Sequence, residues 1–123
     1  MATILVIDDD AQCSQLLRAV FEQAGHTVAT AADGKAGLQM SRARHFDLVI
    51  TDVLMPEKDG LELIKELRRD NPDVQIIAIS GGGLLYAEDC LKMARLFGAQ
   101  HILKKPLDIK ELLQIASTLN PAV

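Results

Sequence analysis

Residues 50–60 of the sequence, ITDVLMPEKDG, place a single aspartate inside an apolar run before a second acidic cluster begins. Asp52 is followed at once by three apolar residues, and Pro56 then stops the run. A carboxylate that is buried without a partner costs several kcal/mol, so a charge in this position needs compensation. We therefore expect groups from other parts of the chain to lie beside Asp52.

Length and composition limit the possible classes of protein. A chain of 123 residues, 49% of them apolar, has the size of one domain, and we expect a single domain over residues 1–123. The net charge of −4 argues against direct binding of nucleic acid or anionic lipid. No stretch approaches the roughly 18 consecutive apolar residues of a membrane span, and the first residues lack a signal peptide's basic segment. The sequence therefore predicts a cytoplasmic chain without membrane insertion.

The number and spacing of the cysteines are consistent with the reducing cytoplasm. Cys13 and Cys90 lie far apart, and neither has a histidine or cysteine at the spacing of metal ligands. We expect two reduced thiols rather than a disulfide or a metal site.

Short apolar runs alternate with helical periodicity along the chain. The runs of strand length are Ile4–Ile7, Thr27–Ala31, Leu48–Thr51, Ile76–Ile79 and His101–Leu103. Apolar spacing or helix-end residues predict helices that face a core over Leu16 to Ala24, Ala36–Ala43, Leu61 to Leu67, Ala87–Phe97 and Ile109 to Leu119. Continuous apolar strands are typical of a parallel sheet covered on both faces, so the β-α alternation predicts a doubly wound α/β sandwich.

Polar residues mark the ends of several predicted helices. Asp108, followed three residues later by Glu111, forms a capping box in front of an apolar-periodic helix. Asp33 suits a helix start and Gly98 a helix end. For Asp10 we favour a helix cap over a metal ligand, because its side chain can accept from the first backbone N–H groups.

The remaining polar groups follow the predicted strands. In open α/β sheets, ligands bind beyond the carboxyl ends of the strands, and here those ends lead into Asp8 and Asp9, Asp52, Ser80 and Lys105. Carboxylates within about 4 Å of one another repel by roughly 4 kcal/mol per pair at an effective dielectric near 20, so they need a cation. An all-oxygen set without thiolate or imidazole favours Mg²⁺ over zinc.

Such a cluster has a chemical use. A metal ion and the Lys105 ammonium would keep Asp52 ionised, and an ionised carboxylate on a rigid strand end is a nucleophile toward phosphorus. Ser80 and Lys105 would hold the oxygens of a bound phosphoryl group. Two plainer interpretations stay open at this stage: a solvated acidic turn at Asp8 and Asp9, and a turn-forming Ser80 without a chemical role.

In combination, these residues resemble the receiver domain of two-component response regulators over essentially the whole chain. The matching features are the pair Asp8-Asp9, then Asp52 followed by Met55-Pro56 and Asp59-Gly60, then Ser80, and finally Lys105-Pro106. The resemblance implies a flavodoxin-like doubly wound (βα)5 sandwich, with five parallel strands in the order 2-1-3-4-5.

The resemblance also implies a set of roles. Asp52 would take a phosphoryl group from the phosphohistidine of a histidine kinase or phosphotransfer protein, or from a small donor such as acetyl phosphate. Mg²⁺ would be bound by Asp9, Asp52 and the backbone carbonyl of Leu54, with Asp8 acting through water. The chain would support its own phosphorylation and dephosphorylation without being a turnover enzyme.

The response to phosphorylation follows from the same resemblance. Ser80 and Lys105 would move toward the phosphoryl group, and the face formed by residues 87–97, 101–103 and 109–119 would rearrange for a downstream protein target. The Lys105-Pro106 bond is commonly cis in this family.

Two departures from the family pattern concern the switch. Ile102, beside His101, stands where the family usually carries an aromatic residue, so the aromatic part of the switch lacks its usual side chain here. Gly82 and Gly83 extend a glycine run after the hydroxyl, so we hypothesise that the 81–86 segment is variable before phosphorylation.

Other functions fit less well. A metal-dependent phosphohydrolase of similar topology needs a second acid two residues after its nucleophile, where Leu54 stands. A flavin carrier needs aromatic residues to flank its ring, and this sequence has 3% aromatic residues and no tryptophan. The main rival is a receiver that docks constitutively without phosphoryl transfer; a phosphate sink and a piece of a longer regulator or hybrid kinase also stay open. Kinase docking would use the first helix and the loop after the fifth strand, and exposed residues such as Gln12, Gln15 and Arg18 are the candidates on the helix.

Overall fold

The structure, a computed structural model, describes residues 2–53, 60–80, 92, 94–105 and 107–118. Its elements in chain order are β1 (Thr3–Ile7), α1 (Ala11–Gln23), β2 (Thr27–Ala31), α2 (Gly34–Ala43), β3 (Leu48–Asp52), α3 (Gly60–Asp70), β4 (Gln75–Ser80), β5 (His101–Lys104) and α5 (Ile109–Ser117). Residues 94–97, between β4 and β5, are also helical.

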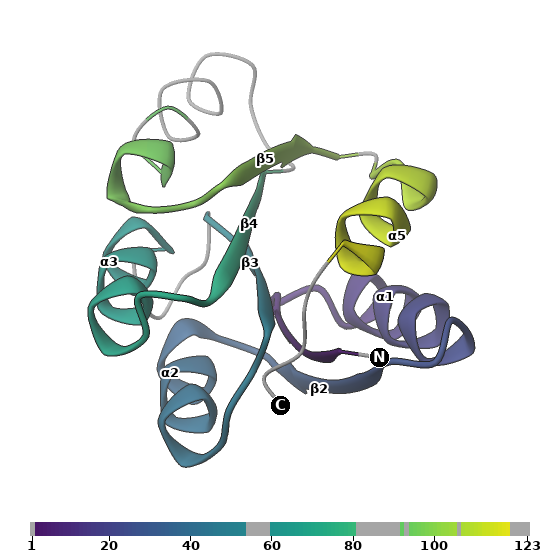
Figure 1. The fold of residues 1–123 in the computed structure, drawn as a ribbon, viewed down its shortest axis with the longest axis horizontal. Helices are drawn as coiled ribbons and strands as arrows, with labels where there is room; N and C mark the ends of the chain where they lie inside the picture. Colours follow the sequence, from purple (N-terminus) through teal and green to yellow (C-terminus); the bar gives the residue numbers. More distant parts are fainter. Residues whose placement is uncertain (1, 54–59, 81–91, 93, 106, 119–123) are drawn as a thin grey trace.

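The strands form one parallel sheet in the order β2-β1-β3-β4-β5 (Figure 1). The doubly wound fold and the predicted strand order are therefore confirmed. β1 and β3 lie side by side at the centre, with Ile7 opposite Thr51. Asp52 lies opposite Ile79 in β4, so these strands reach their carboxyl ends at a common edge of the sheet.

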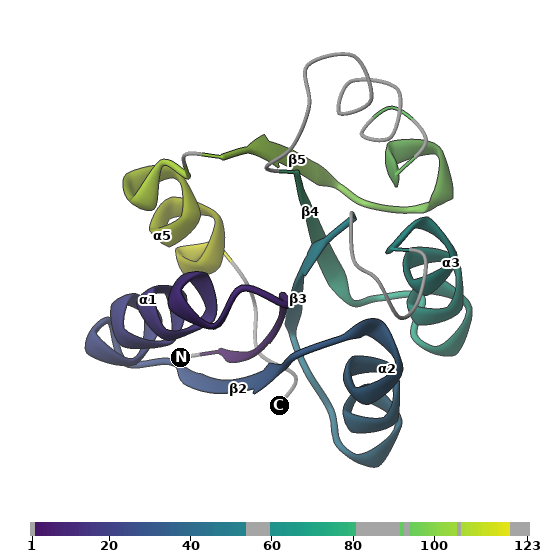
Figure 2. The same ribbon diagram turned by 180° about the vertical axis from the view of Figure 1, so that it is seen from behind.

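Helices cover both faces of the sheet (Figures 1 and 2). α1 and α5 lie on one face, while α2, α3 and residues 94–97 lie on the other. Alternate residues of β1 divide between the two layers: Leu5 and Ile7 pack in the core under α2 and α3, and Ile4 and Val6 pack in the core under α1 and α5. A strand buried on both faces needs apolar residues at every position, which explains the continuous apolar runs of the sequence.

Two residues of the apolar pattern that predicts the first helix, Leu16 and Ala24, are exposed and do not face the core. Leu17 and Phe21 are fully buried against the sheet, but 54% of Leu16 is exposed. Successive helical residues are about 100° apart, so a helix that turns Leu17 and Phe21 to the sheet carries Leu16 toward solvent. The prediction for Leu16 was wrong because periodicity alone did not decide which of two adjacent leucines faces inward.

Three predicted helix caps are confirmed. Asp10 Oδ1 accepts hydrogen bonds from the backbone N–H groups of Gln12 and Cys13 at 3.0 and 3.4 Å. Asp33 and Asp108 each accept one from the backbone N–H three residues later, at 2.8 and 3.3 Å. Each cap satisfies a donor that has no partner inside its own helix.

Gly98 ends the helical residues 94–97, as its type predicts. Its φ of +128° is a conformation that other residues rarely adopt, and its N–H donates to the carbonyl of Ala94 at 3.1 Å. The Arg68 guanidinium of α3 donates to the Gly98 carbonyl at 2.8 Å and to the Pro72 carbonyl at 2.6 Å. Arg68 therefore ties the end of α3 to the chain that leads into β5.

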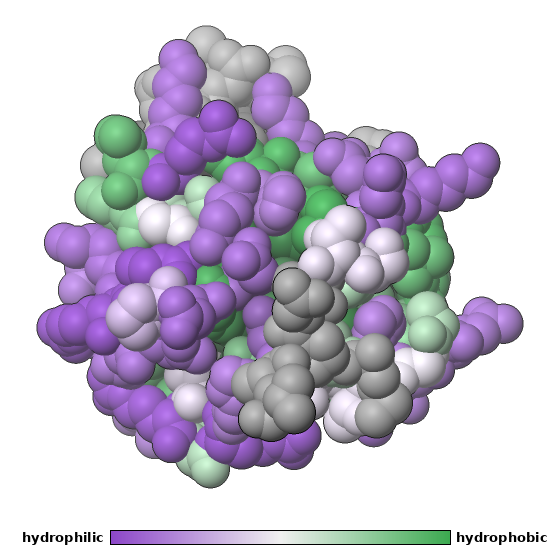
Figure 3. Space-filling view, in the orientation of Figure 1, coloured by the Kyte–Doolittle hydropathy of each residue, from purple (hydrophilic) through white to green (hydrophobic). Residues whose placement is uncertain are grey.

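Hydrophilic side chains cover the outer surfaces of α2 and α3 in the space-filling view (Figure 3). The apolar residues of these helices turn toward the sheet, where Leu38 is 7% exposed and Leu63 is fully buried. Among the described residues, none of the helices is both long and apolar enough to cross a membrane.

Candidate functional site

Three acids meet at the carboxyl edge of the two central strands. Asp8 and Asp9 follow β1, and Asp52 is the last residue of the neighbouring strand β3. One carboxylate oxygen from each of the three lies within 4.8 Å of the others. Asp8 and Asp52 are 2% and 5% exposed, whereas Asp9 is exposed to solvent. Parallel pairing of β1 and β3 therefore brings together acids that lie more than forty residues apart in the chain.

Hydrogen bonds hold Asp8 in a fixed orientation. Its backbone N–H donates to the carbonyl of Ala31 in β2 at 3.1 Å, and its Oδ1 accepts from the backbone N–H of Asp10 at 2.9 Å. The hydroxyl of Ser14 in α1 donates to the Asp8 carbonyl at 3.4 Å. The other carboxylate oxygen, Oδ2, is buried and accepts no hydrogen bond within the described part of the chain.

Lys105 supplies a positive charge to these acids. Its Nζ lies 3.2 Å from Asp8 Oδ2, as an ion pair without hydrogen-bond alignment, and 3.4 Å from Asp52 Oδ2. Burial alone would lower the pKa of Lys105, but attraction to Asp8 and Asp52 outweighs burial and raises that pKa. Lys105 is therefore a stable ammonium at neutral pH and compensates part of the charge of Asp52.

The donor set fits a divalent cation that prefers oxygen. The Lys105 ammonium offsets one of the three carboxylate charges, so these four described side chains together keep a net negative charge. Within the described residues the buried Oδ2 of Asp8 accepts no hydrogen bond, and the exposed Asp9 borders the same space. Mg²⁺ is bound in proteins by one or two carboxylates together with water and phosphate oxygens, which suits this arrangement.

Several predicted features lie outside the described residues or side chains. Ser80 ends β4 and its backbone pairs with Lys104 of β5, but its side chain is not among those described. The features that lie wholly outside are Leu54, the motif residues Met55-Pro56 and Asp59, the 81–86 segment, Cys90 and the Lys105-Pro106 bond. The predictions made for them stay predictions.

Cys13 is a neighbour of the acids that the sequence did not reveal. It is a free thiol in the first turn of α1. Burial, followed by its hydrogen bond to Asp8 and the charge of Asp8, raises the pKa of the Cys13 thiol to about 11. Its position directly after the strand-to-helix turn that carries Asp8 was the signal that could have found it.

The two surfaces singled out in the sequence have clear positions. Gln12, Gln15 and Arg18 are exposed on α1, and Arg18 pairs with Glu22 at 2.6 Å. Ile102 in β5 packs against the core under α2 and α3. An aliphatic side chain therefore fills the position where an aromatic residue is usual.

The sequence model of the response regulator receiver domain matches residues 4–117 of the chain. The chain belongs to this family. Receiver domains are parts of two-component signalling systems, so its role lies in signal transduction. The three acids and Lys105 occupy the strand ends that the resemblance implied.

Two relatives illustrate the range of proteins to which this receiver is similar. It is 37% identical over 114 residues to the DNA-binding transcriptional regulator NtrC of Azospirillum brasilense, covering 93% of this chain and 23% of that protein. It is 32% identical over 115 residues to a response regulator receiver protein of Anaeromyxobacter, covering 94% of this chain and 47% of the relative. The receiver therefore spans less than half the length of either relative.

Solved structures give the same fold. The receiver matches the chemotaxis protein CheY4 of Vibrio cholerae with a TM-score of 0.84 and 28% identity, over 98% of this chain and 99% of that one. A CheY-like receiver domain protein of Methanospirillum hungatei matches with a TM-score of 0.87 and 25% identity, over 95% and 91% of the two chains.

Proposed function

We propose that Asp52 of this receiver accepts a phosphoryl group and that the chain thereby acts as a switch in two-component signal transduction. One observation carries the proposal: Asp52 is 5% exposed at a strand end, beside a second buried acid, Asp8, and its carboxylate lies 3.4 Å from the Lys105 ammonium. A fixed, ionised carboxylate with nearby positive charge is suited to attack phosphorus.

The transfer proceeds by displacement at phosphorus. An oxygen of Asp52 forms a bond to the phosphorus of a phosphohistidine, the phosphorus–nitrogen bond breaks, and the imidazole leaves with a proton from solvent. With acetyl phosphate the bond that breaks is phosphorus–oxygen and acetate leaves. Water later attacks the acyl phosphate, which returns Asp52 and releases inorganic phosphate. The chain is therefore altered and restored in each cycle, as a signalling switch rather than a turnover enzyme.

Asp8, Asp9, Asp52 and the Leu54 carbonyl are the groups that would hold Mg²⁺. When bound, the ion supplies positive charge that offsets the carboxylates and the phosphoryl oxygens. The buried Asp8 Oδ2, which accepts no hydrogen bond from the described residues, supports this assignment for Asp8. Asp9 is exposed and borders the same space, so it supports entry of a hydrated ion.

Lys105 and Ser80 are the residues that would report phosphorylation. Lys105 divides its charge between Asp8 and Asp52, and a phosphoryl group on Asp52 offers it a stronger partner. α5 begins at Ile109, four residues after Lys105, so a shift of the lysine acts directly on that helix. Moving a two-state population from 1:99 to 99:1 requires about 5.5 kcal/mol, and charge-assisted hydrogen bonds from Lys105 and Ser80 would contribute much of it.

The proposal also specifies the phosphoryl donor, the downstream target and the cellular compartment. The donor is a histidine kinase or phosphotransfer protein, and the target is a downstream protein that binds the rearranged face at β5 and α5. Residues 1–123 act as one domain in the cytoplasm. The net charge of −4 supports signalling through protein contact without direct binding of nucleic acid.

Intact-mass measurement with acetyl phosphate and Mg²⁺ tests the proposal. The unmodified chain should gain about 80 Da, one phosphoryl group, while Asp52→Asn should gain nothing. Asp9→Asn should gain the label far more slowly, and excess EDTA should have a similar effect on the unmodified chain. Asp73→Asn, which alters an exposed acid outside the cluster, serves as the matched control and should behave as the unmodified chain.

Two results would overturn the proposal. Labelling of Asp52→Asn at the rate of the unmodified chain would assign the phosphoryl group to another residue. A folded, unmodified chain that gains no mass from either acetyl phosphate or a phosphorylated kinase would instead favour a receiver that docks constitutively.

A further inference from the structure

Asp10 links the three acids to the start of α1. It directly precedes the helix, and its φ of −85° and ψ of 104° are the extended conformation typical of a helix cap. Its Oδ1 accepts hydrogen bonds from the backbone N–H groups of Gln12 and Cys13 at 3.0 and 3.4 Å, and its carbonyl accepts one from the Ser14 N–H at 3.1 Å. Hydrogen bonds from the first turn of α1 therefore fix the backbone of Asp10.

The backbone of Asp10 in turn orients the Asp8 carboxylate. The Asp10 N–H donates to Asp8 Oδ1 at 2.9 Å. With Oδ1 engaged, Asp8 presents Oδ2 to the cluster, where this oxygen lies 3.2 Å from the Lys105 ammonium and accepts no hydrogen bond from the described residues. Asp8 is 2% exposed, so protein groups and not bulk water set this orientation. The direction of the Asp10 N–H thus decides which way a buried carboxylate turns.

The first turn of α1 also holds the main chain beside the acids. The buried Ser14 hydroxyl donates to the Asp8 carbonyl at 3.4 Å, and the Asp8 N–H donates to the Ala31 carbonyl of β2 at 3.1 Å. Asp9 lies between Asp8 and Asp10, so the turn that fixes its two neighbours limits where the Asp9 carboxylate can lie. α1 and β2 therefore hold the segment that supplies two of the three acids.

We propose that Asp10 is a positioning residue for Mg²⁺ binding: by capping α1 it fixes the turn that orients the Asp8 carboxylate and places that of Asp9. The inference rests on the proposed function, because it requires that Asp8 and Asp9 hold the ion. Asp10 is not one of the three acids whose oxygens lie within 4.8 Å of one another, and its Oδ1 faces α1. Removing a group that orients a metal ligand typically lowers metal affinity by about 10–100-fold.

The negative charge of Asp10 must be separated from its cap. Asp10→Asn removes the charge and keeps an oxygen for the N–H groups of α1, because Asn and Asp are about equally good helix caps. Asp10→Ala removes both the charge and the cap. Asp10 is exposed, and at physiological ionic strength the Debye length is about 8 Å, so salt weakens the plain attraction between its charge and a cation.

Mg²⁺ alone, titrated into the folded chain without a phosphoryl donor, is the probe for the test. Isothermal titration calorimetry gives the Kd, and ¹H–¹⁵N spectra follow the amide groups of residues 8–10. Asp10→Ala should weaken Mg²⁺ binding about tenfold, the lower end of the range for groups that orient metal ligands. Asp10→Asn should restore the Kd to within about threefold of the unmodified chain, because the cap is kept and the lost charge is screened.

Asp33→Ala is the matched control for the loss of a helix cap. Asp33 caps α2 through the Ala36 N–H at 2.8 Å, and α2 follows β2, which carries none of the three acids. Urea unfolding should show similar losses of stability in Asp33→Ala and Asp10→Ala, since each removes an acidic cap. The Kd of Asp33→Ala for Mg²⁺ should nevertheless stay within about twofold of the unmodified chain. Circular dichroism checks that both variants remain folded.

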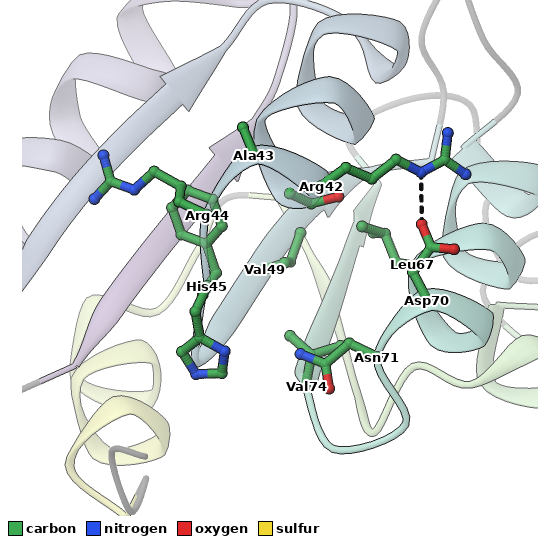
Figure 4. Close-up of a pocket in the computed structure, with 11 residues that line it drawn as sticks. Arg42, Ala43, Arg44, His45, Val49, Leu67, Asp70, Asn71 and Val74 are labelled. Carbon is green, nitrogen blue, oxygen red and sulfur yellow. Dashed lines mark hydrogen bonds and ion pairs between the residues drawn. The ribbon is translucent and has the colours of Figure 1, made fainter. Parts of the chain in front are cut away.

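A charge control lies at the opposite edge of the sheet. A cavity of about 620 Å³ opens there, where α2 and α3 end, and Arg44 and Asp70 are among the residues that line it (Figure 4). Asp70 Oδ2 accepts from Arg42 Nε at 2.8 Å, an ion pair drawn in Figure 4. Asp70→Asn removes the same charge as Asp10→Asn at the far end of the sheet, so it should leave the Kd for Mg²⁺ unchanged.

Three results would overturn the positioning role and leave the proposed function standing. Equal Mg²⁺ affinity in Asp10→Ala and the unmodified chain would show that the cap does not act on the acids. Equal weakening in Asp10→Ala and Asp10→Asn would make charge the whole cause, and equal weakening in Asp33→Ala would assign the effect to a general loss of helix stability. An unmodified chain that binds no Mg²⁺ would instead overturn both this inference and the metal site of the proposed function.

Discussion

The Lys105 ammonium lies 3.2 Å from Oδ2 of Asp8, although the strands that carry these two residues are not neighbours in the sheet. Lys105 follows β5 and Asp8 follows β1, and β3 and β4 lie between them. The lysine therefore reaches across the carboxyl edge of two strands and pairs with Asp52 of β3 on its way. One side chain thus joins the last strand to the proposed metal site.

Replacing Lys105 by methionine should destabilise the chain in buffer without Mg²⁺. The change leaves Asp8 and Asp52 buried without their ammonium partner, and the Lys105 side chain is 25% exposed. Because a fully buried pair costs about 3–5 kcal/mol to break, we expect about 2 kcal/mol in urea unfolding. Lys104→Met, at the exposed neighbouring position, should cost less than 1 kcal/mol, the usual limit for surface ion pairs. Equal costs for both variants would contradict the ion-pair account.

The contribution of Lys105 should also disappear at alkaline pH. Its pKa is raised in the folded chain, so the folded state holds the proton more tightly than the unfolded state. The stabilisation is complete below the unfolded pKa of about 10.4 and is lost as the pH rises through the folded value. The difference in unfolding free energy between the unmodified chain and Lys105→Met should therefore shrink as the pH rises above the unfolded pKa and through the raised folded pKa. A constant difference over that range would show that lost packing, not charge, causes the effect.

Cys13 should react slowly with alkylating agents. Burial and the neighbouring Asp8 raise its pKa from 9.0 to about 11, and the thiolate is the reactive form. Two pKa units reduce the thiolate fraction at neutral pH by about 100-fold, but a more basic thiolate is also about tenfold more nucleophilic, so iodoacetamide should label Cys13 about tenfold more slowly than a model thiol. The measurement uses Cys90→Ser so that one thiol remains. Adding Asp8→Asn should speed labelling, because Asp8 contributes to the raised pKa; an unchanged rate would leave burial as the whole cause.

Much of the fold could be predicted because its signals are local. The continuous apolar runs became the strands, and Asp10, Asp33 and Asp108 became helix caps through bonds to backbone groups two or three residues away. Some strands of the structure extend one residue beyond their predicted ends. β3, for example, includes Asp52, because its pairing with β4 continues past the last apolar side chain. Such extension depends on a partner strand and is absent from the local pattern.

The sequence predicted which residues from distant segments gather at one edge of the sheet, but it did not predict which of them are in contact. Strand-end position brought Asp8, Asp52 and Lys105 to the same region, but it did not reveal that Lys105 favours Asp8 over Asp52 as its closer partner. The cavity at Arg44 was missed altogether. Its lining combines two loops and two helix ends whose packing no single periodicity describes.

Gly37 should not tolerate alanine, although alanine is the better helix former. A Cβ at Gly37 would lie 2.7 Å from Ile7 Cγ1 and even closer to Cδ1, and Ile7 is fully buried in β1. Overpacking of this kind costs about 1–3 kcal/mol, which exceeds the gain of about 1 kcal/mol in helix propensity. Ile7→Val removes Cδ1, so it should cost less in the Gly37→Ala background than alone. Additive costs in this double-mutant cycle would place the strain elsewhere in α2.

His26 should make stability fall in mildly acidic buffer. Its Nδ1 accepts a hydrogen bond from the backbone N–H of Ala2 at 2.9 Å, and its ring packs against the Phe21 ring in a T-shaped arrangement with centroids 6.0 Å apart. The acceptor role requires the neutral ring, and burial lowers the pKa of His26. The unfolded state therefore takes up the proton first, so this stabilisation is present above the unfolded pKa of about 6.5 and is lost as the pH falls toward the lower folded value. One proton limits the slope of the unfolding free energy against pH to about 1.4 kcal/mol per pH unit.

Urea unfolding at pH 7.0, 6.0 and 5.5 should give a smaller slope for His26→Asn, whose side-chain oxygen can accept the same hydrogen bond without titrating. Identical slopes for the two chains would assign the acid sensitivity to other groups.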